Sequence, residues 1–122
     1  MYKRQVLVYE NEDQIKNIKI DKELFDKKNI DPGGVVITAK GKNSDFVSRY
    51  FVPQCSFFED PVTGSTHCSL VPYWSKKLGK QKLTSMQLSE RGGEMFCIDK
   101  GDRVLINGKA QTYSVGKVFL KN

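Results

Sequence analysis

The stretch that decides the fold reads Glu59-Asp60-Pro61-Val62-Thr63-Gly64-Ser65-Thr66-His67-Cys68-Ser69-Leu70-Val71-Pro72-Tyr73-Trp74. Asp60 precedes a proline, which pushes its backbone away from the helical region and towards a turn. Hydroxyl residues and a glycine follow, as they do at the start of a helix. We therefore expect a helix over about residues 65–78, with Ser65 near its N-cap and Gly79 as its stop.

The start of this helix has the properties of an anion site. The first backbone N–H groups of a helix have no partner inside it and carry the positive end of its dipole. Gly64 removes a side chain that would block them, and Thr63 and Ser65 add hydroxyl groups. With Asp60 beside them, these residues predict a binding turn for a small acidic substrate.

The predicted helix is apolar around most of its circumference, which is typical of a helix inside a core. Its apolar residues are Cys68, Leu70, Val71, Tyr73, Trp74 and Leu78. Around it, alternating and short apolar runs predict strands and two further helices. The strands are expected over Gln5–Tyr9, Val35–Ala39, Asp45–Val52, Leu83–Ser89, Glu94–Asp99, Arg103–Ile106, Gln111–Val115 and Lys117–Lys121, and the helices over Glu12–Ile18 and Asp21–Lys28. Asn107-Gly108 predicts a hairpin turn. The result is an α+β fold with a mostly antiparallel sheet around one hydrophobic helix.

Length and composition bound the class of protein. A chain of 122 residues suits one domain, residues 1–122. No apolar run approaches the ~20 residues of a membrane span, and the N-terminus lacks a signal-peptide pattern, so we expect a soluble cytoplasmic protein without a membrane. The 20 basic and 14 acidic residues give a charge of +6, but the lysines are scattered, which disfavours nucleic acid as a partner.

The cysteines predict neither a disulfide framework nor a metal site. Cys55, Cys68 and Cys97 are odd in number and lack C-x-x-C spacing. Buried free thiols are the expected reading, and the apolar neighbours of Cys68 favour packing over reactivity.

Three segments carry a resemblance to a known family. They are the stretch quoted above, Asp45-Phe46-Val47-Ser48-Arg49-Tyr50-Phe51-Val52-Pro53, and Gln87-Leu88-Ser89-Glu90-Arg91-Gly92-Gly93-Glu94. The chain resembles the second half of the PhzF-like phenazine-biosynthesis proteins, members of the diaminopimelate epimerase and proline racemase superfamily. The resemblance implies a curved sheet or half-open barrel wrapped around the central helix, with the active site in a cleft between two such halves.

The resemblance also implies a function. It is cofactor-independent and metal-independent isomerase or epimerase chemistry, a proton transfer on a small carboxylate-bearing substrate. Asp60 would be catalytic, and Thr63, Gly64, Ser65 and His67 would bind substrate. The family's catalytic glutamate belongs to the first half and has no counterpart here, so a second copy or a separately encoded first half would have to complete the cleft. The alternative is a non-catalytic remnant that keeps the fold and the anion-binding turn.

Each candidate residue also has a structural reading. Asp60 is a common turn residue before proline. Ser65 is a common N-cap, Gly64 serves either close approach or a positive φ, and a lone histidine such as His67 is usually a hydrogen-bonded core residue. For Arg49, pairing with Glu59 or Asp45 is favoured over substrate binding, and Arg91-Gly92-Gly93 predicts a turn between strands.

Overall fold

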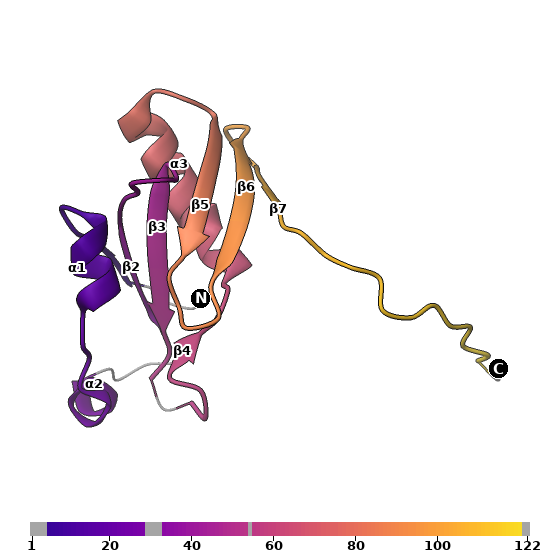
Figure 1. Ribbon diagram of the computed structural model, residues 1–122, viewed down its shortest axis with the longest axis horizontal. Coiled ribbons are helices and arrows are strands. Elements are labelled where there is room, and N and C mark those ends of the chain that lie inside the picture. The colour runs from indigo at the N-terminus through magenta and orange to yellow at the C-terminus, as the bar shows by residue number, and fades with distance from the viewer. Residues whose placement is uncertain (1–4, 29–32, 54, 121–122) are drawn as a thin grey trace.

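The computed structural model describes residues 5–28, 33–53 and 55–120, and Figure 1 shows them as one sheet with helices on both of its faces. The elements in chain order are β1 (Gln5–Val8), α1 (Glu12–Asn17), α2 (Lys22–Lys28), β2 (Val35–Lys40), β3 (Phe46–Phe51), β4 (Glu59–Asp60), the 3₁₀ turn η1 (Gly64–Thr66), α3 (His67–Leu78), β5 (Lys82–Gln87), β6 (Gly93–Asp99) and β7 (Val104–Asn107).

The sheet has seven strands in the order β1-β2-β3-β5-β6-β7, and β4 pairs with β3 beside this path. The β1–β2 and β3–β5 pairs are parallel and the other pairs are antiparallel, which confirms a mostly antiparallel α+β fold. The sheet is open, with β1 and β7 at its two ends. The expected half-open barrel is not confirmed.

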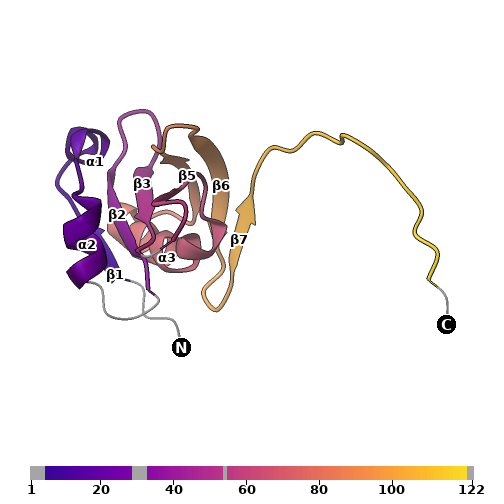
Figure 2. The ribbon, with the colours of Figure 1, turned by 90° about the horizontal axis from the view of Figure 1, so that it is seen from below.

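Alternation along the strands builds a separate core on each face of the sheet. Phe46 and Tyr50 of β3 point to one face, where they join a cluster with Leu70, Val71 and Trp74 of α3. Val47 and Phe51 point to the other face, where they pack with Ile15 of α1 and Phe25 of α2. The expected strand over Asp45–Val52 is confirmed as β3, which is buried on both faces, and Figure 2 shows β2 and β3 between the two helical layers.

Helix α3 covers the first face and lies close to its predicted position. The turn η1 precedes it, and the helix ends at Gly79, whose φ of 68° is the left-handed conformation of a C-cap. The N-cap of α3 is Thr66, next to the expected Ser65, and it makes no side-chain cap bond.

The burial of α3 differs from the prediction of an all-round apolar helix. Leu70, Val71 and Trp74 are buried against the sheet, whereas Tyr73 and Cys68 are exposed. The expected burial of Cys68 was therefore wrong. An open sheet offers the helix one packing surface, so the apolar residues on its far side stay in solvent.

Helix α1 positions Arg49 next to the candidate site. Asn11 caps α1, and its side chain accepts a hydrogen bond from the Gln14 N–H in a complete capping box. The last turn of α1 then presents the carbonyls of Ile15 and Ile18 to the Arg49 guanidinium on β3. These bonds fix Arg49 beside β4.

The C-terminal part of the chain corrects the sequence prediction. Residues 108–120 form neither a strand nor a hairpin, although strands were expected over Gln111–Val115 and Lys117–Lys121 and a turn at Asn107-Gly108. Lys121 itself lies outside the described residues. No strand among the described residues pairs with the segment, and Figures 1 and 2 show it leaving the body of the molecule beyond β7.

Within the described residues, no helix is long and apolar enough to cross a membrane.

Candidate functional site

Asp60 and Thr63 form the centre of the candidate site. Asp60 ends the short strand β4, opposite Tyr50 of β3, and Pro61 then turns the chain towards η1. The Thr63 hydroxyl donates a hydrogen bond to Asp60 Oδ2 at 2.6 Å. The turn therefore holds the Asp60 carboxylate by one of its oxygens.

A buried glutamine from β5 clamps this turn. Gln87 Oε1 accepts the Thr63 backbone N–H at 2.8 Å, and Gln87 Nε2 donates to the Asp60 carbonyl at 2.6 Å and to Thr63 Oγ1 at 3.2 Å. Because Gln87 donates to the Thr63 hydroxyl oxygen, the hydroxyl proton is directed at Asp60. Gln87 is only 1% exposed, so these bonds are shielded from water.

Gly64 and Ser65 are the exposed part of the turn. Gly64 does not have a positive φ, and a Cβ built on it would meet no atom within 4 Å. The structure therefore removes the conformational reason for a glycine at this position. The other expectation, close approach of another molecule to the backbone at the start of the helix, stays a prediction.

His67 is fully buried in the core and contacts the turn from the core side. Its Nδ1 contacts the Thr63 carbonyl at 3.0 Å and its Nε2 contacts Ser85 Oγ at 2.9 Å. A carbonyl only accepts, so Nδ1 carries the proton and Nε2 accepts from the serine hydroxyl. Burial lowers the pKa of His67 below its ordinary value, while the bond to the Thr63 carbonyl raises it. The neutral ring thus holds Thr63 by a second bond.

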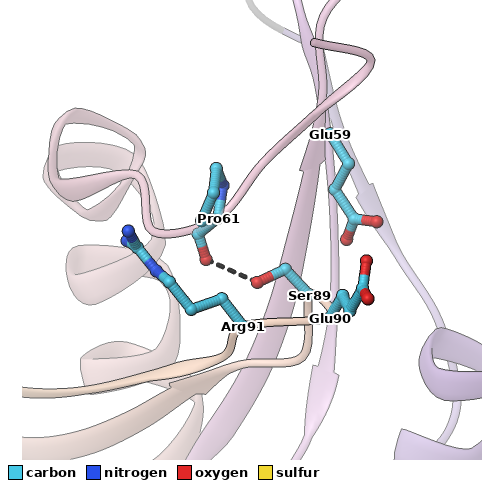
Figure 3. A pocket seen from close by; sticks show the side chains of 5 residues that line it. All are labelled: Glu59, Pro61, Ser89, Glu90 and Arg91. Atoms are coloured by element: carbon cyan, nitrogen blue, oxygen red, sulfur yellow. Dashed lines mark hydrogen bonds between the residues drawn. The ribbon is translucent and has the colours of Figure 1, made fainter.

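A pocket of about 450 Å³ adjoins the other side of the turn. Its lining residues are Glu59, Pro61, Ser89, Glu90 and Arg91 (Figure 3). The Ser89 hydroxyl donates to the Pro61 carbonyl at 2.7 Å, which ties the β5–β6 loop to the turn. Asp60 itself is not among the lining residues.

Two charged groups of this pocket differ in their partners. Glu59 binds Arg49 through two bonds, 2.7 Å from Nε to Oε1 and 2.8 Å from Nη2 to Oε2, which confirms the predicted pairing. Arg91 is exposed, and Figure 3 shows its guanidinium on the opposite side of the pocket from Glu59 and Glu90. Both carboxylate oxygens of Glu59 are therefore bound to Arg49, whereas the Arg91 side chain is exposed to solvent.

The Arg91 loop is a tight turn, as predicted. Gly92 has φ of 68°, and its N–H donates to Ser89 Oγ at 3.0 Å. A Cβ on Gly93 would come within 2.4 Å of a Val62 methyl group, so this glycine lets the loop touch the Asp60 turn. A second pocket of about 400 Å³ includes both Arg91 and Val62 in its lining.

Among the described residues, no three His, Cys, Asp or Glu side chains are arranged to hold a metal ion. The buried thiol closest to this network is Cys97. Burial raises its pKa to about 11, and a hydrogen bond with Ser85 opposes that rise.

The structure thus brings Asp60, Thr63, Gly64 and Ser65 together on one turn and places His67 beneath it. Sequence reasoning missed the clamp by Gln87. The sequence did contain an indication of this clamp. Gln87 continues the alternation of Leu83 and Ser85, whose side chains point into the core. A buried amide at such a position requires polar partners.

Comparison with known proteins finds relatives over most of the chain. The PhzC-PhzF family model, described as phenazine biosynthesis-like protein, matches residues 3–116. An uncharacterized isomerase of Pseudomonas aeruginosa is 52% identical over 87 residues, which cover 71% of this chain and 33% of that protein. A phenazine biosynthesis-like domain-containing protein of Homo sapiens is 40% identical over 109 residues, with coverages of 82% and 38%.

Solved structures agree in fold and in extent. A PhzC/PhzF phenazine biosynthesis protein from Clostridium difficile superimposes with a TM-score of 0.82 and 43% identity, covering 96% of this chain and 45% of that one. A PhzF-family protein from Enterococcus faecalis gives a TM-score of 0.81 at 38% identity, covering 94% and 44%. The chain therefore spans between about a third and just under half the length of these relatives. With a family match over nearly its whole length and the same fold as two solved members, this chain belongs to the PhzC-PhzF family of phenazine biosynthesis-like proteins.

Proposed function

We propose that this chain forms one wall of an isomerase active site that moves a proton on a small carboxylate-bearing substrate. Family membership and the isomerase names of several relatives support the reaction class. The observation that carries the proposal is the Asp60–Thr63 hydrogen bond directly beside the open backbone of Gly64.

Asp60 acts in this proposal as the general acid and base. The Thr63 bond engages Oδ2 and fixes the plane of the carboxylate, so Oδ1 is the oxygen that takes and returns the proton. A positioned group of this kind contributes about 10²–10⁴-fold to a proton transfer. Gln87 and His67 serve as positioning residues, since each bonds Thr63 and not the substrate.

The exposed backbone at Gly64 and Ser65 binds the substrate carboxylate. The positive end of the helix dipole lies there, and it favours an anion by about 0.3–1 kcal/mol at an exposed surface. An anion held at this point is adjacent to Asp60 and shares the turn with it. The proposal includes no metal and no organic cofactor.

The proposed active site requires a second wall, formed by another polypeptide segment. The chain covers 45% of the length of a solved relative. By its resemblance to the family, we expect the catalytic glutamate to belong to the first half. A second copy or a separately encoded first half would supply that side. With two copies, two Asp60 carboxylates would face one cavity. A purified protein that stays strictly monomeric in light scattering would refute the hypothesis that two copies form the active site.

The reaction is tested by solvent exchange. The protein is incubated in D₂O with a panel of cyclic amino and hydroxy acids, and NMR follows deuterium entering the carbon next to the carboxylate. We expect exchange by the assembled protein and a loss of about 10²–10⁴-fold in Asp60→Asn. Equal exchange by the variant would eliminate Asp60 as the catalyst.

Gly64→Ala separates binding from folding. An added Cβ meets nothing within 4 Å, and the φ of this residue is not positive, so the free energy of unfolding should stay within about 0.5 kcal/mol. The substrate KM should nevertheless rise, because the methyl group stands where the carboxylate approaches the backbone. An unchanged KM would place the ligand elsewhere.

A non-catalytic remnant is the second candidate. The partial coverage supports it, because the match extends over only 33% of one relative and 45% of a solved one. It predicts no exchange on any substrate and no effect of Asp60→Asn beyond local stability. Measurable turnover that depends on Asp60 would exclude it.

A further inference from the structure

The Thr63 carbonyl is held in the core by two side chains. The Thr66 hydroxyl donates a hydrogen bond to it at 2.8 Å, and His67 Nδ1 lies 3.0 Å from it. Thr66 is 2% exposed and His67 is 0% exposed, so water does not compete for these bonds. The peptide group between Thr63 and Gly64 therefore cannot rotate without leaving two buried donors unpaired.

The N–H of Gly64 belongs to the same peptide group as this carbonyl. In a trans peptide the C=O and the N–H point in opposite directions, and none of the described residues has a cis peptide bond. Because the carbonyl points into the core, the Gly64 N–H points to the exposed side of the turn. Within the described part of the chain, no group accepts a hydrogen bond from it. The contacts on the buried side thus aim a donor at the place where the proposed function puts the substrate carboxylate.

Ser85 of β5 keeps the ring proton of His67 on the side of the turn. A neutral imidazole has one N–H donor and one acceptor nitrogen. Nε2 lies 2.9 Å from Ser85 Oγ. While the serine hydroxyl donates to Nε2, the ring proton stays on Nδ1 and bonds the Thr63 carbonyl. Ser85 is 0% exposed, so no solvent molecule takes over its role.

Cys97 of β6 gives this chain of hydrogen bonds its direction. Its side chain bonds Ser85, and burial raises the pKa of its thiol to about 11, so the thiol keeps its proton at neutral pH. A thiol that donates to Ser85 Oγ leaves the serine proton for Nε2 of His67. The bonds then run one way, from Cys97 through Ser85 and His67 to the Thr63 carbonyl.

We propose that Ser85 and Cys97 are positioning residues of the proposed active site. Through His67 they hold and polarise the peptide group between Thr63 and Gly64, so that the Gly64 N–H is a pre-aimed and stronger donor to the substrate carboxylate. Bonds in such a chain strengthen one another by about 10–30% each. The identity of the ligand rests on the proposed function, whereas the chain of bonds is tested without any ligand.

NMR of the ligand-free protein reads the chain directly. His67 is the only histidine, so the imidazole ¹H–¹⁵N correlations report on this ring alone. We expect the Nδ1–H tautomer in the wild type at neutral pH. Ser85→Ala removes the donor to Nε2, so we expect a mixture of the two tautomers and a shift of the Gly64 amide proton to higher field. A role in core packing alone would lower stability and move neither signal.

Three variants serve as controls. Ser48→Ala removes an equally buried hydroxyl that has no partner among the described residues, and it should leave both signals unchanged. Cys97→Ser keeps a donor to Ser85 and should resemble the wild type. Cys97→Val fills a similar volume without a donor, so it should shift both signals in the direction of Ser85→Ala but less far. Circular dichroism establishes that each variant is folded.

The deuterium-exchange reaction gives a second measurement. Because the chain acts on carboxylate binding and not on Asp60, Ser85→Ala should raise the substrate KM by about 2- to 10-fold. Its kcat should stay within about 2-fold of the wild type. Asp60→Asn shows the opposite division, since its loss is expected in kcat.

Four results would overturn the proposal. The first is an Nε2–H tautomer in the wild type, and the second is a Gly64 amide that stays in place in Ser85→Ala. The third is an unchanged KM in that variant when the wild type is active. If Ser85→Ala does not fold, the Cys97 pair decides, and equal spectra of Cys97→Ser and Cys97→Val are the fourth. A wild type without exchange activity refutes the proposed function alone, because the NMR signals still test the chain.

Discussion

Replacing Gln87 with methionine should destabilise the protein without creating a cavity. Methionine has nearly the same length and volume as glutamine, so the core stays filled. The change removes the three hydrogen bonds that hold the Asp60–Thr63 turn. It also leaves the Thr63 backbone N–H without its partner in a buried position.

The magnitude follows from these groups. Each bond contributes about 0.5–1.5 kcal/mol, and an unpaired buried donor costs about 1–3 kcal/mol. We therefore expect a loss of roughly 3 kcal/mol in the free energy of unfolding. For a chain of this size, that loss lowers Tm by on the order of 12 °C.

Urea unfolding followed by fluorescence measures this loss, because Trp74 is the only tryptophan and lies in the core. Gln81→Ala is the matched control, since the side chain of Gln81 is exposed, and it should stay within about 0.5 kcal/mol. A loss below about 1 kcal/mol in Gln87→Met would refute the clamp.

A double-mutant cycle distinguishes the clamp from general damage. Thr63→Val removes the hydroxyl that accepts from Gln87 and donates to Asp60. If the residues act as one network, the double variant should lose less than the sum of the two single losses, by about 0.5–3 kcal/mol. Strict additivity would show that Gln87 and Thr63 act independently.

Three further predictions use other buried groups. Burial lowers the pKa of His67, the only histidine, so on acidification the unfolded chain binds a proton at a higher pH than the folded chain does. The free energy of unfolding should therefore fall as the pH drops below about 6.5, by at most ~1.4 kcal/mol per pH unit. A urea midpoint that stays constant between about pH 7.5 and 5.5 would contradict this. Ser48 Oγ is buried and has no hydrogen-bond partner among the described residues, so Ser48→Ala should raise the free energy of unfolding by about 1 kcal/mol in the same assay. A thiol reagent should modify exposed Cys68 in the native protein and reach Cys97 only on unfolding, and similar labelling rates would show that Cys97 is accessible.

Sequence reasoning succeeded where the cause of structure is local. Helix α1, the end of α3 at Gly79 and strand β3 each follow from residues within a few positions of one another. The grouping of Asp60, Thr63, Gly64 and Ser65 followed for the same reason, since one turn contains all four.

The failures share a non-local cause. Whether Cys68 is buried depends on what covers the far side of α3, and an open sheet does not cover it. The alternation in Gln111–Val115 indicates a strand, but a strand exists only beside a partner. Gln87 reaches the Asp60 turn through the β3–β5 pairing, and no local pattern near Asp60 indicates that contact.

The parallel pairing of β3 with β5 also determines when the site forms during folding. The β2–β3 and β5–β6 pairs join strands that are close in the chain, so their loops close at little entropic cost. The β3–β5 pair, in which Phe46 lies opposite Ser85, joins strands that are separated in the chain by the whole of α3. The hydrogen bond from the Thr63 N–H to Gln87 forms together with this pair. A nascent chain that has released β4 and α3 from the ribosome therefore carries every proposed binding residue without its native geometry, and the site is completed only when β5 arrives.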